Sequence, residues 1–140
     1  MKMKPVANED MVKNALGAEG YDELAEPPHV DAPRAHRLWP EILKALRGIY
    51  DPEIPVNIYE LGLIYKVIVK EKPDGKADVD VKMTLTSPGC PVAQEMPGWV
   101  QSAILPLDGI GDVDVEIVWE PTWDPSLMAE TAKMQLNMFV

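Results

Sequence analysis

Two strands joined by a tight turn occupy the middle of the sequence. Residues 77–85 alternate between apolar and polar side chains, and a period of two is typical of a strand with one buried face. The inward side chains are Val79, Val81, Met83 and Leu85. Residues 63–69 are rich in β-branched residues, and Pro73-Asp74-Gly75 between the two segments is typical of a hairpin turn. One apolar face must be covered, so the chain has to supply a second layer.

Segments with helical spacing follow and precede this hairpin. Residues 38–49 carry apolar side chains three and four positions apart, and residues 97–107 do the same before a glycine-rich end. A third helix is expected from Pro125 to about Asn137, because Asp124 is a good N-cap and proline suits the first helical position. Residues 113–119 alternate as a third strand.

The predicted order is therefore helix, strand, strand, helix, strand, helix. The fold class is α+β: a small two-layer α/β domain with a three-stranded mixed sheet and helices packed on one face. Residues 34–140 form this domain. Residues 1–33 contain scattered acidic residues, several prolines and few large apolar groups, so we predict a flexible acidic N-terminal arm that docks at most weakly on the domain. The spacing of Val12, Ala15 and Leu16 allows a short helix, but their apolar surface is small for ordering it.

Composition excludes several functional classes. The net charge of −10 argues against binding of a nucleic-acid backbone. No apolar run approaches the roughly 20 residues that span a bilayer, and no secretory signal is expected. One cysteine in 140 residues indicates a reducing compartment, the cytoplasm.

That cysteine, Cys90, follows Ser87-Pro88-Gly89 and precedes Pro91, where a strand ends and a helix is expected. The N-terminal end of a helix favours the thiolate, the form that binds metal or attacks an electrophile. The alternative is a small buried side chain without chemistry, since free cysteines are often packed inside proteins. A lone cysteine needs ligands from a second molecule if it binds metal.

The other candidate residues give weaker signals. Asp51 and Glu53 form an acidic pair in a proline-braced loop, which could bind loop amides, orient the surroundings of the thiol or hold a cation; alternatively Asp51 caps a turn and Glu53 is solvated. Thr84 and Thr86 offer hydroxyls before the thiol, with no histidine base close in the sequence, so no hydrolase triad is visible. The two histidines are expected at the surface, and the tryptophans and methionines of the second half form core or an interaction surface.

Several motifs in order resemble one family. Asp51-Pro52-Glu53-Ile54-Pro55-Val56-Asn57-Ile58, Leu61-Gly62-Leu63-Ile64-Tyr65, Met83 through Pro91 and Val118-Trp119-Glu120-Pro121-Thr122-Trp123 are similar to the SufT/PaaD-like family of iron–sulfur assembly factors. The resemblance covers about residues 37–138. The SufT-type members are the nearer likeness, because PaaD-type proteins usually carry further cysteines after the domain.

The resemblance implies a non-catalytic cytoplasmic factor that helps transfer iron–sulfur clusters to apoproteins. Cys90 would be the reactive or cluster-binding cysteine, with Asp51, Glu53, Thr84 and Thr86 as its supporting loop. A cluster normally has four thiolate ligands, so a cluster on Cys90 would be transient and shared with a second molecule, which favours a homodimer or a partner protein. The implied partners are scaffold or carrier proteins and client apoproteins, without nucleic acid or membrane.

Two alternatives stay open beside this one. The first is a purely structural adaptor, in which Cys90 is packed and the tryptophan and methionine surface recruits assembly machinery. The second is a thiol enzyme, which the missing resolving cysteine and the missing nearby base disfavour.

Overall fold

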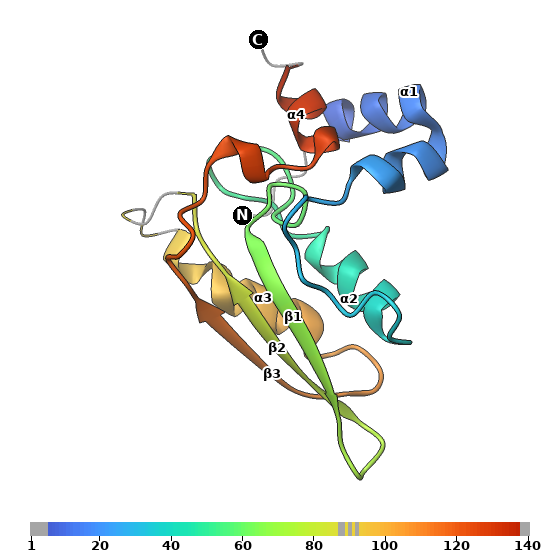
Figure 1. The fold of residues 1–140 in the computed structure, drawn as a ribbon, viewed down its shortest axis with the longest axis vertical. Helices are drawn as coiled ribbons and strands as arrows, with labels where there is room; N and C mark the ends of the chain where they lie inside the picture. The colour runs from blue at the N-terminus through green and yellow to red at the C-terminus, as the bar shows by residue number, and fades with distance from the viewer. Residues whose placement is uncertain (1–5, 87–88, 90, 92, 138–140) are drawn as a thin grey trace.

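The computed structural model describes residues 6–86, 89, 91 and 93–137. Its elements are α1 (Val6–Leu24), α2 (Trp39–Leu46), β1 (Ile64–Glu71), β2 (Ala77–Met83), the 3₁₀ turn η1 (Ala93–Glu95), α3 (Met96–Ile104), β3 (Ile110–Ile117), the 3₁₀ turn η2 (Pro125–Leu127) and α4 (Glu130–Asn137) (Figure 1). The strands form one sheet in the order β1-β2-β3, with β1 antiparallel to β2 and β2 parallel to β3. The α+β class and the three-stranded mixed sheet are confirmed.

Local sequence explains both connections within the sheet. The hairpin between β1 and β2 closes with a hydrogen bond from Lys72 N–H to Lys76 O (2.8 Å), and Gly75 supplies the positive φ of 86° that this turn needs. Parallel strands need a longer crossover than a hairpin, and α3 provides it between β2 and β3.

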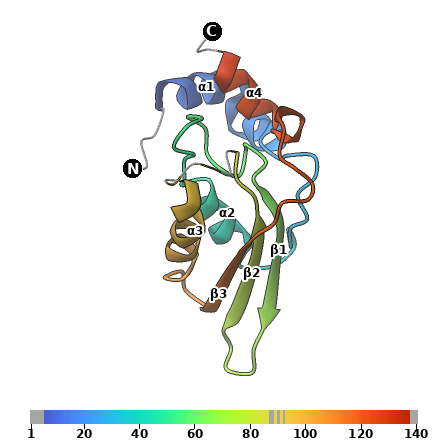
Figure 2. The same cartoon turned by 90° about the vertical axis from the view of Figure 1, so that its left-hand side faces the viewer.

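The main core lies between the sheet and the two helices α2 and α3, which cover the same face of the sheet (Figure 2). Side chains of β2 alternate between buried and half-buried along the whole strand, as the period of two predicts. The buried residues of these elements include Ile42, Leu46, Val67, Val79, Val81, Met83, Val100, Ile104 and Val113.

The N-terminal segment contributes more structure than a short helix. Helix α1 breaks at Gly17, whose φ of 77° is not helical, and it packs against α4 at one end of the sheet (Figures 1 and 2). Val12 and Tyr21 are buried in this contact. Further along, Asp31 pairs with β1: its N–H donates to Tyr65 O (3.1 Å), and its carbonyl accepts from Val67 N–H (2.9 Å). A domain boundary at residue 33 and a flexible arm stay predictions.

The prediction of one continuous helix from Pro125 to Asn137 is wrong. Asp124 does cap a turn, by accepting a hydrogen bond from Ser126 N–H (2.7 Å), but only the short turn η2 follows it. Met128 is then extended (φ −71°, ψ 148°), and Ala129 N–H donates to the carbonyl of Glu60 (2.8 Å). This contact with another part of the chain replaces a helical hydrogen bond, so the helix starts again only at α4.

Every helix within the described ranges is too short or too polar to cross a lipid bilayer.

Candidate functional site

Asp51 organises the loop that follows α2. Its side chain is buried, and Oδ2 accepts hydrogen bonds from the backbone N–H of Glu53 (2.9 Å) and of Ile54 (2.8 Å). A carboxylate bonded to amides two and three positions ahead is the usual way in which aspartate holds a turn. The Asp51 N–H donates to Val56 O (3.2 Å), which closes the loop. The Glu53 side chain points to solvent and takes part only through its backbone.

The same carboxylate reaches the end of β2. Thr84 is buried and its N–H donates to Leu63 O (2.9 Å), so the chain still follows the sheet at this point. Two residues later, the Thr86 hydroxyl donates to Oδ1 of Asp51 at 3.4 Å. The structure therefore brings Asp51 and Thr86 together, keeps Thr84 buried at the end of β2 and leaves Glu53 at the surface.

Residues 87–92, which we call the thiol loop, connect this contact to α3. Cys90 itself lies outside the described residues, so its own placement stays a prediction. Its neighbours Gly89 and Pro91 are both exposed. Beyond the loop, Met96 at the start of α3 is fully buried. The described chain is thus anchored on both sides of the thiol loop, by Thr86 before it and by Met96 after it.

A metal site complete within one chain is not found in the described part of the molecule. No group of three or more His, Cys, Asp or Glu side chains in these ranges could hold a metal ion. Oδ2 of Asp51 already accepts two backbone hydrogen bonds. A cation held by the Asp51 and Glu53 pair therefore has no support from this geometry.

The expectation of surface histidines is wrong for His29. This ring is half-buried, and its Nε2–H donates to Gly62 O (3.0 Å), while Nδ1 is buried without a hydrogen-bond partner among the described residues. Burial lowers the pKa of His29, because a second ring proton would enter an apolar site. Gly62 must be glycine: its φ is 84°, and a Cβ there would lie 2.2 Å from the carbonyl oxygen of Leu127.

Glu60 lies at the centre of a buried hydrogen-bond network that the sequence analysis did not identify. Its side chain is fully buried and accepts hydrogen bonds from Tyr21 (2.7 Å), Asn57 (2.7 Å), Gln135 (3.2 Å) and Thr131, with the guanidinium of Arg47 at 3.5 Å. So many donors offset the cost of removing a carboxylate from water. A single acid inside the apolar run from residue 58 to residue 65 was the available signal.

Comparisons with known proteins match the same part of the chain. A family model described as an iron–sulfur cluster assembly protein matches residues 40–117, which contain Asp51, the thiol loop and the sheet. The chain belongs to this iron–sulfur cluster assembly protein family. Helices α1 and α4, which bury Glu60, lie outside the matched range.

Three relatives are named as Fe–S protein maturation auxiliary factors. An Fe–S protein maturation auxiliary factor of Porphyromonas gingivalis is 43% identical over 97 residues, which is 69% of this chain and 89% of the relative. The auxiliary factor YitW of Bacillus subtilis is 40% identical over 97 residues (69% and 91%). The auxiliary factor SufT of Staphylococcus aureus is 39% identical over 90 residues (64% and 98%).

Solved structures agree on the fold. A domain of unknown function from Bacillus anthracis superposes with a TM-score of 0.59 at 30% identity and covers 71% of this chain and 91% of that one. A conserved hypothetical protein from Thermotoga maritima gives a TM-score of 0.57 at 29% identity, with 72% and 93% covered.

Proposed function

We propose that this protein is an auxiliary maturation factor that helps deliver iron–sulfur clusters to apoproteins, and that Cys90 is a transient ligand of the cluster in transit. The observation that carries the proposal is the family match over residues 40–117, with relatives at 39–43% identity that are named as Fe–S protein maturation auxiliary factors. The anchored thiol loop supports it, since the described neighbours of Cys90 are exposed.

The cluster is cargo in this proposal, and the chain is poorly equipped to keep it. Iron–sulfur clusters are normally held by four thiolates, and the sequence contains one. The described residues supply no further group of ligands. The remaining ligands come from a second copy of the chain, a small thiol or a carrier protein. Such incomplete ligation suits transfer, because a cluster that is held by one strong ligand is readily passed on.

Asp51 and Thr86 act in this proposal as positioning residues rather than ligands. Their contact fixes the point where the thiol loop leaves the sheet, and the backbone N–H of Thr84 joins the preceding residues to Leu63. Glu53 helps only by its backbone N–H. The role is non-catalytic and belongs to the cytoplasm, where thiols stay reduced. The partners are iron–sulfur scaffold or carrier proteins and client apoproteins.

A second candidate function is an adaptor that recruits assembly machinery without touching the cluster. Trp119 favours it, because 47% of this large apolar side chain is exposed just after β3. Exposed tryptophans are common at protein interfaces.

Anaerobic reconstitution with iron and sulfide separates the two functions. The wild-type protein should develop visible absorbance of a cluster and pass it to an apoprotein, whereas Cys90→Ser should stay colourless with an unchanged circular-dichroism spectrum. Rapid alkylation of the wild-type thiol near neutral pH should accompany this result. A wild-type protein that stays colourless would favour the adaptor.

A further inference from the structure

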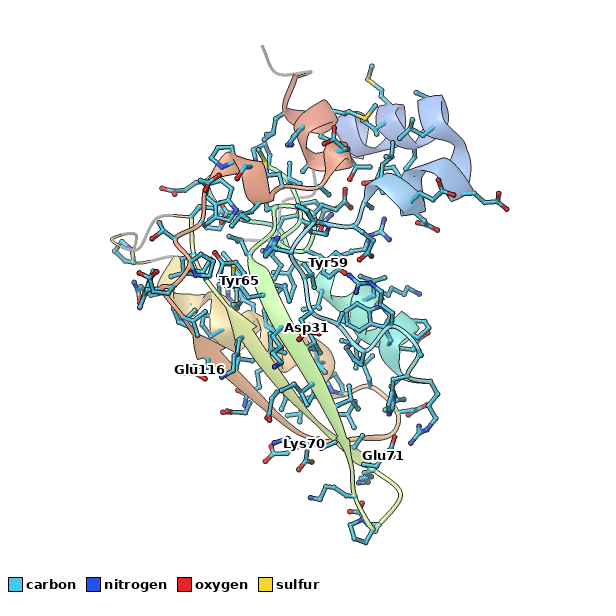
Figure 3. All side chains as sticks on the ribbon, viewed as in Figure 1. Asp31, Tyr59, Tyr65, Lys70, Glu71 and Glu116 are labelled. Atoms are coloured by element: carbon cyan, nitrogen blue, oxygen red, sulfur yellow. The ribbon has the colours of Figure 1, made fainter. Side chains whose placement is uncertain are left out.

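The two edges of the sheet differ in what covers them. The edge of β1 is covered over part of its length, because Asp31 exchanges two backbone hydrogen bonds with Tyr65 and Val67. The opposite edge belongs to β3, and Figure 1 shows no described helix or strand alongside its outer side. Figure 3 shows Asp31 beside β1 and Glu116 on β3 across the sheet. An uncovered edge strand is a template for pairing with another chain.

The register identifies which backbone groups of β3 face outward. The N–H of Val118 donates to Met83 O on β2 (2.8 Å), so Val118 faces inward within the sheet plane. N–H and C=O groups alternate in direction from one residue to the next along a strand, so those of Val115 and Ile117 point away from β2. Among the described residues, these outward groups have no hydrogen-bond partner.

The start of β3 is closed by side chains. The amide of Gln101 donates to Val113 O (2.9 Å), and the carboxylate of Asp112 accepts from Val113 N–H (3.0 Å). The open stretch therefore runs from Val115 to the exposed Trp119.

The side chains beside the open stretch are acidic. Asp114 and Glu116 are both exposed, and Glu116 pairs with Lys82 (2.7 Å). Asp114 lies opposite Asp80, whose nearest cation is Lys70 (2.7 Å). Like charges on neighbouring strands are destabilising. Lys70 and Lys82 attract the Asp114 carboxylate, but neither forms an ion pair with it in the described part of the chain. Asp114 and its neighbour Glu116 can therefore still attract basic side chains of a partner.

Trp119 lies at the end of the open stretch. Its half-exposed indole directly follows the outward groups of Val115 and Ile117. Residues 114 and 119 are an odd number of positions apart, so a regular strand places them on opposite faces. The indole therefore offers an apolar contact to the opposite, apolar side of a partner strand.

We propose that an extended, basic segment of a partner protein pairs with β3 between Val115 and Trp119 as a fourth strand of the sheet. Main-chain hydrogen bonds to Val115 and Ile117 supply the pairing, and basic side chains over Asp114 and Glu116, which lie on the same face of β3, select the segment. This surface does not involve Cys90, so the proposal can be tested separately from the cluster chemistry.

The test uses the full chain and a fluorescent, end-blocked peptide of alternating lysine and valine. Val115→Pro removes an outward N–H without removing a hydrogen bond to β2 and leaves the net charge unchanged. It should weaken peptide binding about tenfold, the effect of losing one or two main-chain hydrogen bonds. Asp114→Lys should also weaken binding, whereas Glu41→Lys on α2, with the same change in charge, should bind as wild type.

Hydrogen exchange of backbone amides distinguishes main-chain pairing from simple attraction between charges. The amides of Val115 and Ile117 should become protected when the peptide is added to wild-type protein. Where Val115→Pro fails to fold, the Asp114→Lys and Glu41→Lys pair and the exchange data decide. Absence of binding to wild type, equal binding by Val115→Pro, or no protection at these amides would overturn the proposal. So would a wild-type dimer that Val115→Pro converts to a monomer, since a second copy would then be the occupant.

Discussion

The hydroxyl of Thr86 donates to Oδ1 of Asp51 at 3.4 Å, while Oδ2 of the same carboxylate holds the backbone N–H groups of Glu53 and Ile54. One buried side chain thus joins the loop after α2 to the end of β2, directly before the thiol loop. The two acidic residues of this loop therefore differ: the Asp51 side chain holds the loop, and the Glu53 side chain points to solvent.

This inequality predicts different effects of two alanine substitutions. Asp51→Ala removes the acceptor of two backbone hydrogen bonds and should lower the free energy of unfolding by about 1–2 kcal/mol. It should also slow cluster transfer, because the start of the thiol loop loses its anchor. Urea denaturation and an anaerobic transfer assay measure the two effects. Glu53→Ala is the matched control and should leave both quantities near wild type; equal losses in the two variants would argue against a special role of Asp51.

The hydrogen bond from the Tyr21 hydroxyl should contribute to the stability of the fold. Tyr21→Phe removes a donor from the buried carboxylate of Glu60 but keeps the ring, so it should lower the free energy of unfolding by about 1.5–3 kcal/mol. Tyr65→Phe is the control, since that hydroxyl donates to Pro121 O at an exposed position (2.7 Å). Its loss should cost less than about 1 kcal/mol, because water replaces the bond. Denaturation curves in which Tyr65→Phe is the less stable variant would contradict this account of Glu60.

His29 should make stability depend on pH. Its pKa in the folded protein lies below the ordinary value of 6.5, so below pH 6.5 the unfolded chain binds more protons than the folded one and stability falls as the pH is lowered. His29→Gln cannot bind this proton. Urea denaturation between pH 7.5 and pH 5 should therefore show a steeper loss for wild type than for the variant, and carboxylates that titrate in both proteins cancel in the difference. Parallel curves would mean that the His29 site does not disfavour the charged ring.

The strands and the helices that cover them could be predicted, because their burial follows from the spacing of apolar residues close together in the sequence. The alternation through Val79 and Val81 requires that one face of the sheet be covered. The apolar spacing of residues 38–49 gives a helix with one apolar face, which can cover it. The break after η2 could not be predicted in this way. It depends on the bond between Ala129 N–H and Glu60 O, and local spacing carries no information about that distant acceptor.

The same limit applies to the site and to α1. Asp51, Thr84 and Thr86 were grouped by resemblance to a family, and no spacing rule places Asp51 beside Thr86. For α1, a count of apolar residues underestimates the packing, because Tyr21 is held by a buried polar network that reaches α4 through Gln135.

The proposed role of the Cys90 thiol in cluster delivery can be tested in cells. Cys90→Ser and wild type should be expressed at matched levels in a strain that lacks the protein, and the activities of iron–sulfur enzymes should be measured. Cys90→Ser should leave these activities at the level of the strain without the protein, while wild type should restore them. Full restoration by Cys90→Ser would contradict this role.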